Sequence, residues 1–205
     1  MNINQIIERI LHSKKYNKYP KEFVKRAVLK NLNKNDPLKS TKLMLHEMSG
    51  MFKNLKSADR VSAIWKFIVR KIGKQEKILD LGAGNDYGFF KNIDIDYTGV
   101  DIFPIPGIVQ DDVLNPKKSW KNENYDLVLI INLIPVVERM ETGSGKKLIN
   151  YWEEKSKYIV LSFPLYSITS RKYIGAYWKN YIKEKLNKDY EIIGKEIVVL
   201  LKGRL

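Results

Sequence analysis

Apolar residues recur at helical spacing along the first seventy residues of the chain. One face of segment 2–12 is apolar and consists of Ile3, Ile6, Ile7, Ile10 and Leu11. The same 3.6-residue period predicts further helices over 20–32, 39–52 and 58–72. Pro20 and Gly73 support these boundaries, because proline is common in the first turn of a helix and glycine commonly follows the last turn. The first third of the chain is therefore predicted to be helical and amphipathic.

After Gly73 the pattern changes to short runs of β-branched and aromatic residues that alternate with helical segments. Strands are predicted over 77–84, 97–102, 125–134 and 157–164, with a short one within 107–116, and helices over 138–155 and 172–188. The last segment, 190–203, holds two apolar runs separated by Gly194 and Lys195, which predicts an antiparallel pair. This alternation indicates an α/β fold with a mostly parallel, Rossmann-like sheet. We divide the chain into a helical region, 1–58, and a sheet domain, 59–205.

The composition excludes several kinds of site. The chain has 205 residues, no cysteine and only two histidines, His12 and His46, so neither a disulfide nor a zinc site is expected. The lack of cysteine also argues against methylation of pyrimidine carbon 5, which usually needs a cysteine nucleophile. The apolar runs are too short to span a membrane, and the N-terminus lacks the apolar core of a signal peptide. We expect a cytoplasmic protein without a metal or membrane partner, and we expect it to act as a monomer.

Positive charge is concentrated near the N-terminus. The formal net charge is +14, and residues 1–60 hold fourteen lysines and arginines against five aspartates and glutamates, a net of +9. Cationic side chains gain affinity for phosphates by releasing counterions, so a polyanion such as RNA is the expected partner. The alternative is a surface that only keeps the protein soluble. The candidate docking residues are Lys14, Lys15, Lys18, Lys21, Lys25 and Arg26.

A glycine-containing turn follows the first predicted strand. The stretch ILDLGAGNDYG places Asp80, Gly82 and Gly84 at the end of that strand. A dinucleotide-binding fingerprint, GxGxxG, would need a third glycine at position 87, but that residue is Tyr87. This argues against a nicotinamide cofactor and favours S-adenosylmethionine, a cofactor without phosphates.

Acidic residues stand at the ends of the next two strands. Asp101 closes the second strand, where a carboxylate can bind both hydroxyls of a ribose. Asp111 and Asp112 follow the third, and Asp112 is the better candidate to accept from the amino group of adenine. The alternative is a pair of turn glycines and a few surface aspartates. That alternative has to explain why these residues all fall at successive strand ends.

The end of the fourth strand bears on the atom that is methylated. It reads Asn132-Leu133-Ile134-Pro135, unlike the Asn or Asp followed by Pro-Pro-aromatic that is common in methyltransferases for exocyclic amines. No histidine lies in residues 47–205, so the sheet domain offers no histidine as a general base. An acceptor with a free lone pair and no proton to lose would fit, and N7 of guanine is one. Orienting such an acceptor toward the methyl group could supply most of the rate acceleration.

Four stretches of the sequence are similar to one known family. They are MNIN with ILHSKKY (10–16), LDLGAGN (79–85), LIINLIPVVER (129–139) and VLSFPLYSITSR (160–171). With them the chain resembles the aminoglycoside-resistance methyltransferases that modify 16S ribosomal RNA at N7 of a decoding-site guanine. The last stretch is the most specific, because the family has a signature of Ser-Phe-Pro followed by a serine and an arginine. The resemblance implies a class I methyltransferase sheet, S-adenosylmethionine as cofactor, 16S rRNA of the small ribosomal subunit as partner, and aminoglycoside resistance.

The resemblance also implies roles for individual residues. The target base would enter at the end of the last parallel strand, so the predicted catalytic residues are Ser162, Phe163, Pro164 and Asn132. Asn132 would also contact the cofactor, and Arg60 is the nearest match to the family residue that binds the cofactor carboxylate. The residues implied to face the RNA are Tyr166, Ser167, Arg171 and Lys172. Taken by itself, stretch 162–172 is better explained as a simple connection between a strand and a helix, and core packing explains Phe163 at least as well as a role at the site.

The chain departs from the family pattern at several positions. Ala83 and Asp86 stand where cysteine and proline are usual, and Leu165-Tyr166 and Thr169-Ser170 replace Thr-Arg and a pair of glycines. Two other functions therefore stay open: a methyltransferase that acts on a small molecule, and a noncatalytic RNA-binding protein that has kept the fold. The first of these leaves the basic N-terminal region unexplained.

Overall fold

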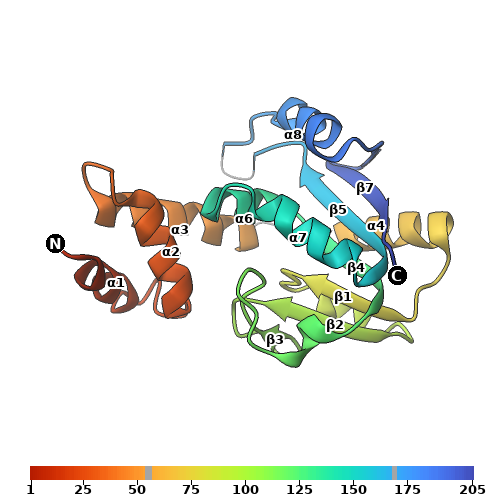
Figure 1. The fold of residues 1–205 in the computed structure, drawn as a ribbon, viewed down its shortest axis with the longest axis horizontal. Coiled ribbons are helices and arrows are strands. Elements are labelled where there is room, and N and C mark those ends of the chain that lie inside the picture. The colour runs from red at the N-terminus through yellow and green to blue at the C-terminus, as the bar shows by residue number, and fades with distance from the viewer. Residues whose placement is uncertain (54–56, 168–169) are drawn as a thin grey trace.

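The protein is built around a sheet of seven strands, shown in the computed structural model of Figure 1. The structure describes residues 1–53, 57–167 and 170–205, and of residues 49–58 it describes no side chains. The strands stand in the order β3-β2-β1-β4-β5-β7-β6. Their bounds are β1 Lys77–Leu81, β2 Asp96–Asp101, β3 Val109–Gln110, β4 Tyr125–Ile131, β5 Ser156–Pro164, β6 Glu191–Ile193 and β7 Glu196–Lys202.

The direction of the strands creates one functional edge. Strands β1 to β5 run parallel, whereas β7 lies antiparallel between β5 and β6. Ser162 near the end of β5 pairs with Ile131 at the end of β4, and Pro164 pairs with Glu196 at the start of β7. The carboxyl ends of the parallel strands and the first residue of β7 therefore meet at the same edge, here called the carboxyl edge. Open α/β sheets bind their ligands at this edge.

Both faces of the sheet are covered, and alternate residues of the central strands face opposite sides. Ile78 and Leu127 belong to the apolar cluster of α4 (Ser57–Ile72) and α5 (Tyr87–Phe90). Their neighbours Leu79 and Val128 belong to the cluster of α6 (Ile134–Met140) and α7 (Ser144–Glu153). All four side chains are fully buried. This burial on two sides explains why the strands read as nearly continuous apolar runs.

The N-terminal helices are α1 (Ile3–Leu11), α2 (Lys21–Asn31) and α3 (Pro37–Lys53), and Figure 1 shows them beside α6. Their buried residues belong to the same apolar cluster as α6 and one face of the sheet. Tyr19 packs edge-on against Phe103, which follows β2, with ring centroids 4.8 Å apart. Arg139 of α6 forms an ion pair with Glu47 of α3. The helical region is therefore packed against the carboxyl edge.

Two predicted strands end earlier than the sequence pattern indicates. Strands predicted to continue to residues 84 and 134 end at Leu81 and Ile131. The next residues, Gly82 and Asn132, have positive φ angles of 73° and 52°, which turn the chain out of the sheet. Both turns lie at the carboxyl edge.

The later helices are also more divided than predicted. The helix predicted over 138–155 is two helices, α6 and α7, with Gly143 at a φ of 84° between them. The helix predicted over 172–188 is α8 (Gly175–Tyr181) followed by a π-helical turn, Ile182–Leu186. Within these two predicted segments the apolar spacing does not reveal the break at Gly143 or the change from an α-helix to a π-helical turn. The division of the chain at residue 58 stays a prediction.

Candidate functional site

The loop after β1 folds back onto the end of β2. The N–H of Gly82 donates to the carbonyl of Val100 at 2.8 Å, and the N–H of Gly84 donates to Oδ2 of Asp101 at 2.9 Å. Gly82 and Gly84 both have positive φ angles, which side chains rarely adopt. A Cβ at Gly82 would also lie 3.1 Å from Cδ1 of Leu133. The loop therefore needs glycine, and it brings β1, β2 and the start of α6 close together.

The carboxylate of Asp101 is held in a fixed position at the carboxyl edge by two backbone N–H groups. Its residue is only 2% exposed, Oδ2 accepts from Gly84 and Oδ1 accepts from the N–H of Phe103 at 2.9 Å. Burial raises the pKa of Asp101, and the backbone donors oppose this shift. Each carboxylate oxygen can accept more than one hydrogen bond, so both keep a position for a further donor. Two neighbouring hydroxyls would match this arrangement.

Asp111 and Asp112 have different surroundings. Asp111 accepts from Nε1 of Trp120 at 2.8 Å and from the N–H groups of Lys117 and Lys118, each at 3.0 Å, so it holds its own loop together. Both aspartates line one pocket, where the carboxylate of Asp112 accepts from the N–H of Leu114 and forms an ion pair with Arg26. Asp112 accepts fewer hydrogen bonds from its own loop than Asp111, so it is the better candidate of the two to meet a ligand.

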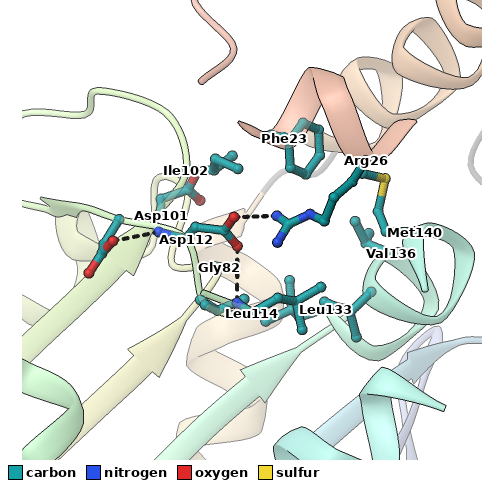
Figure 2. A pocket seen from close by; sticks show the side chains of 13 residues that line it. Phe23, Arg26, Gly82, Asp101, Ile102, Asp112, Leu114, Leu133, Val136 and Met140 are labelled. Atoms are coloured by element: carbon teal, nitrogen blue, oxygen red, sulfur yellow. Dashed lines mark hydrogen bonds and ion pairs between the residues drawn. The ribbon is translucent and has the colours of Figure 1, made fainter. Parts of the chain in front are cut away.

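The pocket beside Asp112 is mostly apolar, and α2 forms part of its wall. Figure 2 shows Arg26 and Phe23 reaching from α2 toward Asp112, opposite the sheet. The other lining residues are Gly82, Asp101, Ile102, Asp111, Val113, Leu114, Leu133, Val136, Val137 and Met140. An apolar slot that ends at a carboxylate suits a flat heteroaromatic ring with an amino group.

Arg26 is predicted to dock on RNA, but in the structure its side chain pairs with Asp112 and is mostly buried. Only 21% of its side chain is exposed, and its guanidinium is used by Asp112. Because its charge is neutralised inside the protein, Arg26 contributes little to an external cationic surface. Phe23 was not identified from the sequence, since nothing in a helical pattern shows that one turn of α2 lies over the end of β3.

A second cavity joins the basic N-terminal segment to the cofactor loop. Its walls are Lys14, Lys15, Lys18 and Tyr19 on one side and Gly84, Asn85, Asp101, Phe103, Pro104 and Ile105 on the other. Three of the six predicted docking cations thus line the same cavity as Asp101. Two others, Lys21 and Lys25, are half-exposed on α2. Lys21 pairs with Glu8 at 2.9 Å, and Lys25 pairs with Glu22 at 3.8 Å.

A group of polar side chains lies under the ends of β1, β4 and β5. We call it the polar cluster, and it consists of Arg60, Asp80, Asp86, Asn132, Ser162 and Glu196. Asp80 accepts from the hydroxyl of Tyr97 at 2.8 Å, and Arg60 lies 3.9 Å from Oδ1 of Asp86. Burial raises the pKa values of Asp80 and Glu196, while the charge of Arg60 lowers both. Arg60 therefore acts on carboxylates at both ends of the cluster.

The polar cluster has unused hydrogen-bonding capacity. Seven buried side-chain nitrogen or oxygen atoms in the described residues have no hydrogen-bond partner, and four of them lie here: Nε and Nη1 of Arg60, Oδ1 of Asp80 and Oδ1 of Asn132. An unpaired buried polar group costs about 1–3 kcal/mol. A ligand with its own donors and acceptors would remove that cost, so these atoms mark a polar binding site next to the glycine loop.

The end of β5 separates the three residues of the Ser-Phe-Pro stretch. Ser162 is fully buried, and its Oγ lies 3.3 Å from Oε2 of Glu196. Phe163 is also fully buried, and its ring stacks on Trp178 of α8 at a centroid distance of 5.2 Å. Pro164 is buried beside Glu196. The structure thus places Phe163 in the core, where packing accounts for it, while catalytic roles for Ser162 and Pro164 stay predictions.

The loop after β5 presents the residues that the sequence implies for RNA contact. Tyr166 is 46% exposed and packs edge-on against Tyr173, and Arg171 and Lys172 are exposed. The N–H of Ser167 donates to the carbonyl of Lys172 at 2.7 Å, which closes the loop on itself. Thr169, one of the departures from the family pattern, lies outside the described residues. Contact of this loop with RNA stays a prediction.

Two negative findings apply to the parts of the chain that the structure describes. No group of three or more histidine, aspartate or glutamate side chains there is arranged to hold a metal ion. None of the helices in the same residues is long and apolar enough to cross a membrane.

Comparison with known proteins identifies the fold. No protein-family model matches the chain, and no curated protein matches it either. Among solved structures, the 16S rRNA methylase RmtB is similar over 100% of this chain and 99% of its own, with a TM-score of 0.73 and 20% identity. An rRNA methylase from Escherichia coli covers 99% and 100%, with a TM-score of 0.70 and 20% identity. The 16S rRNA methyltransferase RmtF, in complex with S-adenosyl-L-homocysteine, covers 100% of both chains, with a TM-score of 0.71 and 16% identity.

These similarities extend over the N-terminal helices as well as the sheet. They confirm the predicted fold class, a Rossmann-like methyltransferase sheet with an antiparallel C-terminal strand and a helical N-terminal extension.

Proposed function

We propose that the protein transfers a methyl group from S-adenosylmethionine to N7 of a guanine in the decoding region of 16S rRNA in the small ribosomal subunit, and thereby gives resistance to aminoglycosides. One observation carries the proposal: Lys14, Lys15 and Lys18 line the same cavity as Gly84 and Asp101. The proposed site for a nucleoside-containing cofactor thus adjoins a group of lysines that can bind phosphates. Similarity over the whole chain to structures of 16S rRNA methylases supports the choice of RNA as substrate.

The residues at the carboxyl edge fit the parts of S-adenosylmethionine one by one. Asp101 would accept from the ribose hydroxyls, and the apolar pocket beside Asp112 would hold the adenine ring. The unpaired guanidinium nitrogens of Arg60 would bind the carboxylate of the methionine end, and the unpaired oxygens of Asp80 and Asn132 would bind its ammonium group. When bound there, S-adenosylmethionine supplies a methyl group on a positively charged sulfur.

The chemistry asked of the protein is mainly positioning. N7 of guanine attacks with a lone pair, so no side chain has to remove a proton from it. The sheet domain accordingly contains no histidine, and its ends of β4 and β5 offer neutral polar groups, Asn132 and Ser162. Alignment of two reacting groups at close distance can by itself account for about 7–11 kcal/mol of a barrier. A guanine in a folded RNA would have to turn out of its stack to reach this edge.

The test is to find the methylated atom. Purified protein is incubated with labelled S-adenosylmethionine and either intact small ribosomal subunits or naked 16S rRNA, and N7-methylguanine is mapped by chain cleavage. We expect a mark at the decoding-site guanine. A mark at a different guanine would keep the reaction and remove the inference of resistance. If the cofactor binds but neither RNA is labelled, a small-molecule substrate replaces RNA; if neither binding nor labelling occurs, the protein is a noncatalytic relic of the fold.

Reversing the charges at the mouth of the site should weaken RNA binding and its dependence on salt. In the variant Lys14→Glu/Lys15→Glu, the slope of log K against log salt concentration should become shallower by roughly 1.4–1.8, since each of the two lost phosphate contacts contributes about 0.7–0.9 to it. Filter binding at several salt concentrations measures this slope.

The matched control reverses two lysines at the opposite edge of the sheet, Lys74→Glu/Lys202→Glu. Lys74 lies just before β1 and Lys202 at the end of β7, so neither can reach RNA held at the carboxyl edge. Both double variants change the net charge equally. An equal change of slope in the two would show that only overall charge matters and would remove the docking role of Lys14 and Lys15.

A further inference from the structure

Glu196 brings a carboxylate to the carboxyl edge from the far end of the sequence. It is the first residue of β7, and because β7 runs antiparallel to β5, this first residue lies beside Pro164 at the end of β5. Glu196 is only 6% exposed. The sequence pattern assigned it no role beyond the start of the last strand, although a charged residue opens an otherwise apolar run there. A buried carboxylate at this edge requires partners.

The partners of Glu196 belong to the predicted site. Oε1 of Glu196 accepts from Nδ2 of Asn132 at 3.0 Å, and the hydroxyl of Ser162 donates to Oε2 at 3.3 Å. The charge of Arg60 also stabilises the carboxylate of Glu196. Glu196 is thus held by residues from α4, β5 and the turn after β4.

These contacts fix the orientation of the Asn132 amide. An ionised carboxylate can only accept hydrogen bonds, so the NH₂ group of Asn132 has to face Glu196 and the oxygen Oδ1 has to face the other way. The backbone of Asn132 is fixed as well, because its N–H donates to the carbonyl and the hydroxyl of Ser162, each at 3.2 Å. Oδ1 of Asn132 is buried there and has no hydrogen-bond partner.

The unpaired donors and acceptors of the polar cluster match an amino acid in its charged form. Oδ1 of Asn132 and Oδ1 of Asp80 accept, and Nε and Nη1 of Arg60 donate. An ammonium group supplies donors to the first pair, and a carboxylate accepts from the second. If the amide of Asn132 turned over, its NH₂ group would face the ammonium group and this match would be lost.

We propose that Glu196 is a positioning residue that holds Oδ1 of Asn132 toward the ammonium group at the methionine end of S-adenosylmethionine. This inference rests on the proposed function. Glu196 does not touch the cofactor in this arrangement; it acts through Asn132. Its effect is therefore confined to the amino acid end of the ligand and leaves recognition of adenosine to Asp101 and the apolar pocket.

The test compares two ligands that share adenosine. S-adenosylhomocysteine carries the amino acid end, and 5′-methylthioadenosine lacks it. In the variant Glu196→Gln, the amide can donate as well as accept, so the orientation of Asn132 is no longer fixed. Calorimetry should show a roughly 10-fold to 100-fold loss of affinity for S-adenosylhomocysteine, the range expected for losing one charge-assisted hydrogen bond. Affinity for 5′-methylthioadenosine should stay within about 2-fold, the scatter expected when no interaction is lost.

Three further variants control for charge and test whether Glu196 acts through Asn132. Glu191→Gln, on the neighbouring strand β6, removes the same charge from an exposed pair with Arg70 and Lys71 and should change neither affinity. Asn132→Ala should weaken S-adenosylhomocysteine as Glu196→Gln does, and the double variant should be no weaker than Asn132→Ala alone. Fully additive losses would overturn the proposal, because Glu196 would then act independently of Asn132.

The failures of the two proposals are distinguishable. If the wild-type protein binds neither ligand, the proposed function itself fails. If the wild-type protein binds S-adenosylhomocysteine and Glu196→Gln leaves that affinity unchanged, only the positioning role fails. Equal losses for both ligands would mean that Glu196 supports the fold of the whole edge, which also overturns the positioning role.

Discussion

Replacement of Asp101 by asparagine should reduce the affinity for S-adenosylhomocysteine by at least about 100-fold, the equivalent of two charge-assisted hydrogen bonds. The carboxylate of Asp101 spends one acceptor position of each oxygen on the N–H groups of Gly84 and Phe103. The remaining positions would serve the two ribose hydroxyls. An amide keeps only one accepting oxygen, and its NH₂ group would face a backbone N–H or a hydroxyl without being able to accept from it. Isothermal titration calorimetry measures the loss.

The control for Asp101→Asn is Asp94→Asn. Asp94 is fully exposed in the loop before β2 and pairs with Lys74 at 3.6 Å, so its replacement should leave the affinity within about 2-fold. Because Asp101 also holds the glycine loop, thermal unfolding of both variants has to be recorded. If Asp101→Asn remains folded and binds S-adenosylhomocysteine normally, the cofactor does not lie in this site.

Residues that stand at strand ends were predictable from the sequence. Asp80, Gly82, Gly84 and Asp101 were found because periodicity locates the ends of two buried strands, and a parallel sheet brings such ends to one edge. That argument needs only local sequence and one general rule of topology. It does not depend on how any helix packs.

Residues that reach the site through packing or strand pairing were not predictable. Glu196 comes to the carboxyl edge only because β7 inserts antiparallel between β5 and β6, and Phe23 does so only because α2 crosses the end of the sheet. The alternation along β5 already separates Ser162 from Phe163, since neighbours on a strand face opposite sides. It does not show which side is covered by α8 and which faces the polar cluster, so the sequence leaves open whether Phe163 packs in the core or faces the site.

The second large effect is expected at the contact between α2 and the adenine pocket. Arg26→Glu should lower the free energy of unfolding by about 2–4 kcal/mol, because it replaces a mostly buried ion pair with two facing carboxylates. The pair is 16–21% exposed, so we expect a value toward the lower end of the range for fully buried pairs. Urea unfolding measures the change. The neighbouring Lys25→Glu alters only a half-exposed cation beside Glu22 and should cost less than about 1 kcal/mol.

A charge swap separates the structural role of this pair from its role in the pocket. Arg26→Asp combined with Asp112→Arg restores opposite charges, so a good part of the lost stability should return. The swapped protein should bind S-adenosylhomocysteine more weakly than the wild-type protein, because it has a cation where the amino group of adenine would be received. If the swapped protein is stable and binds S-adenosylhomocysteine normally, Asp112 has no part in adenine recognition and only ties α2 to the sheet. If Arg26→Glu leaves the free energy of unfolding unchanged, the ion pair does not hold the helical region against the carboxyl edge.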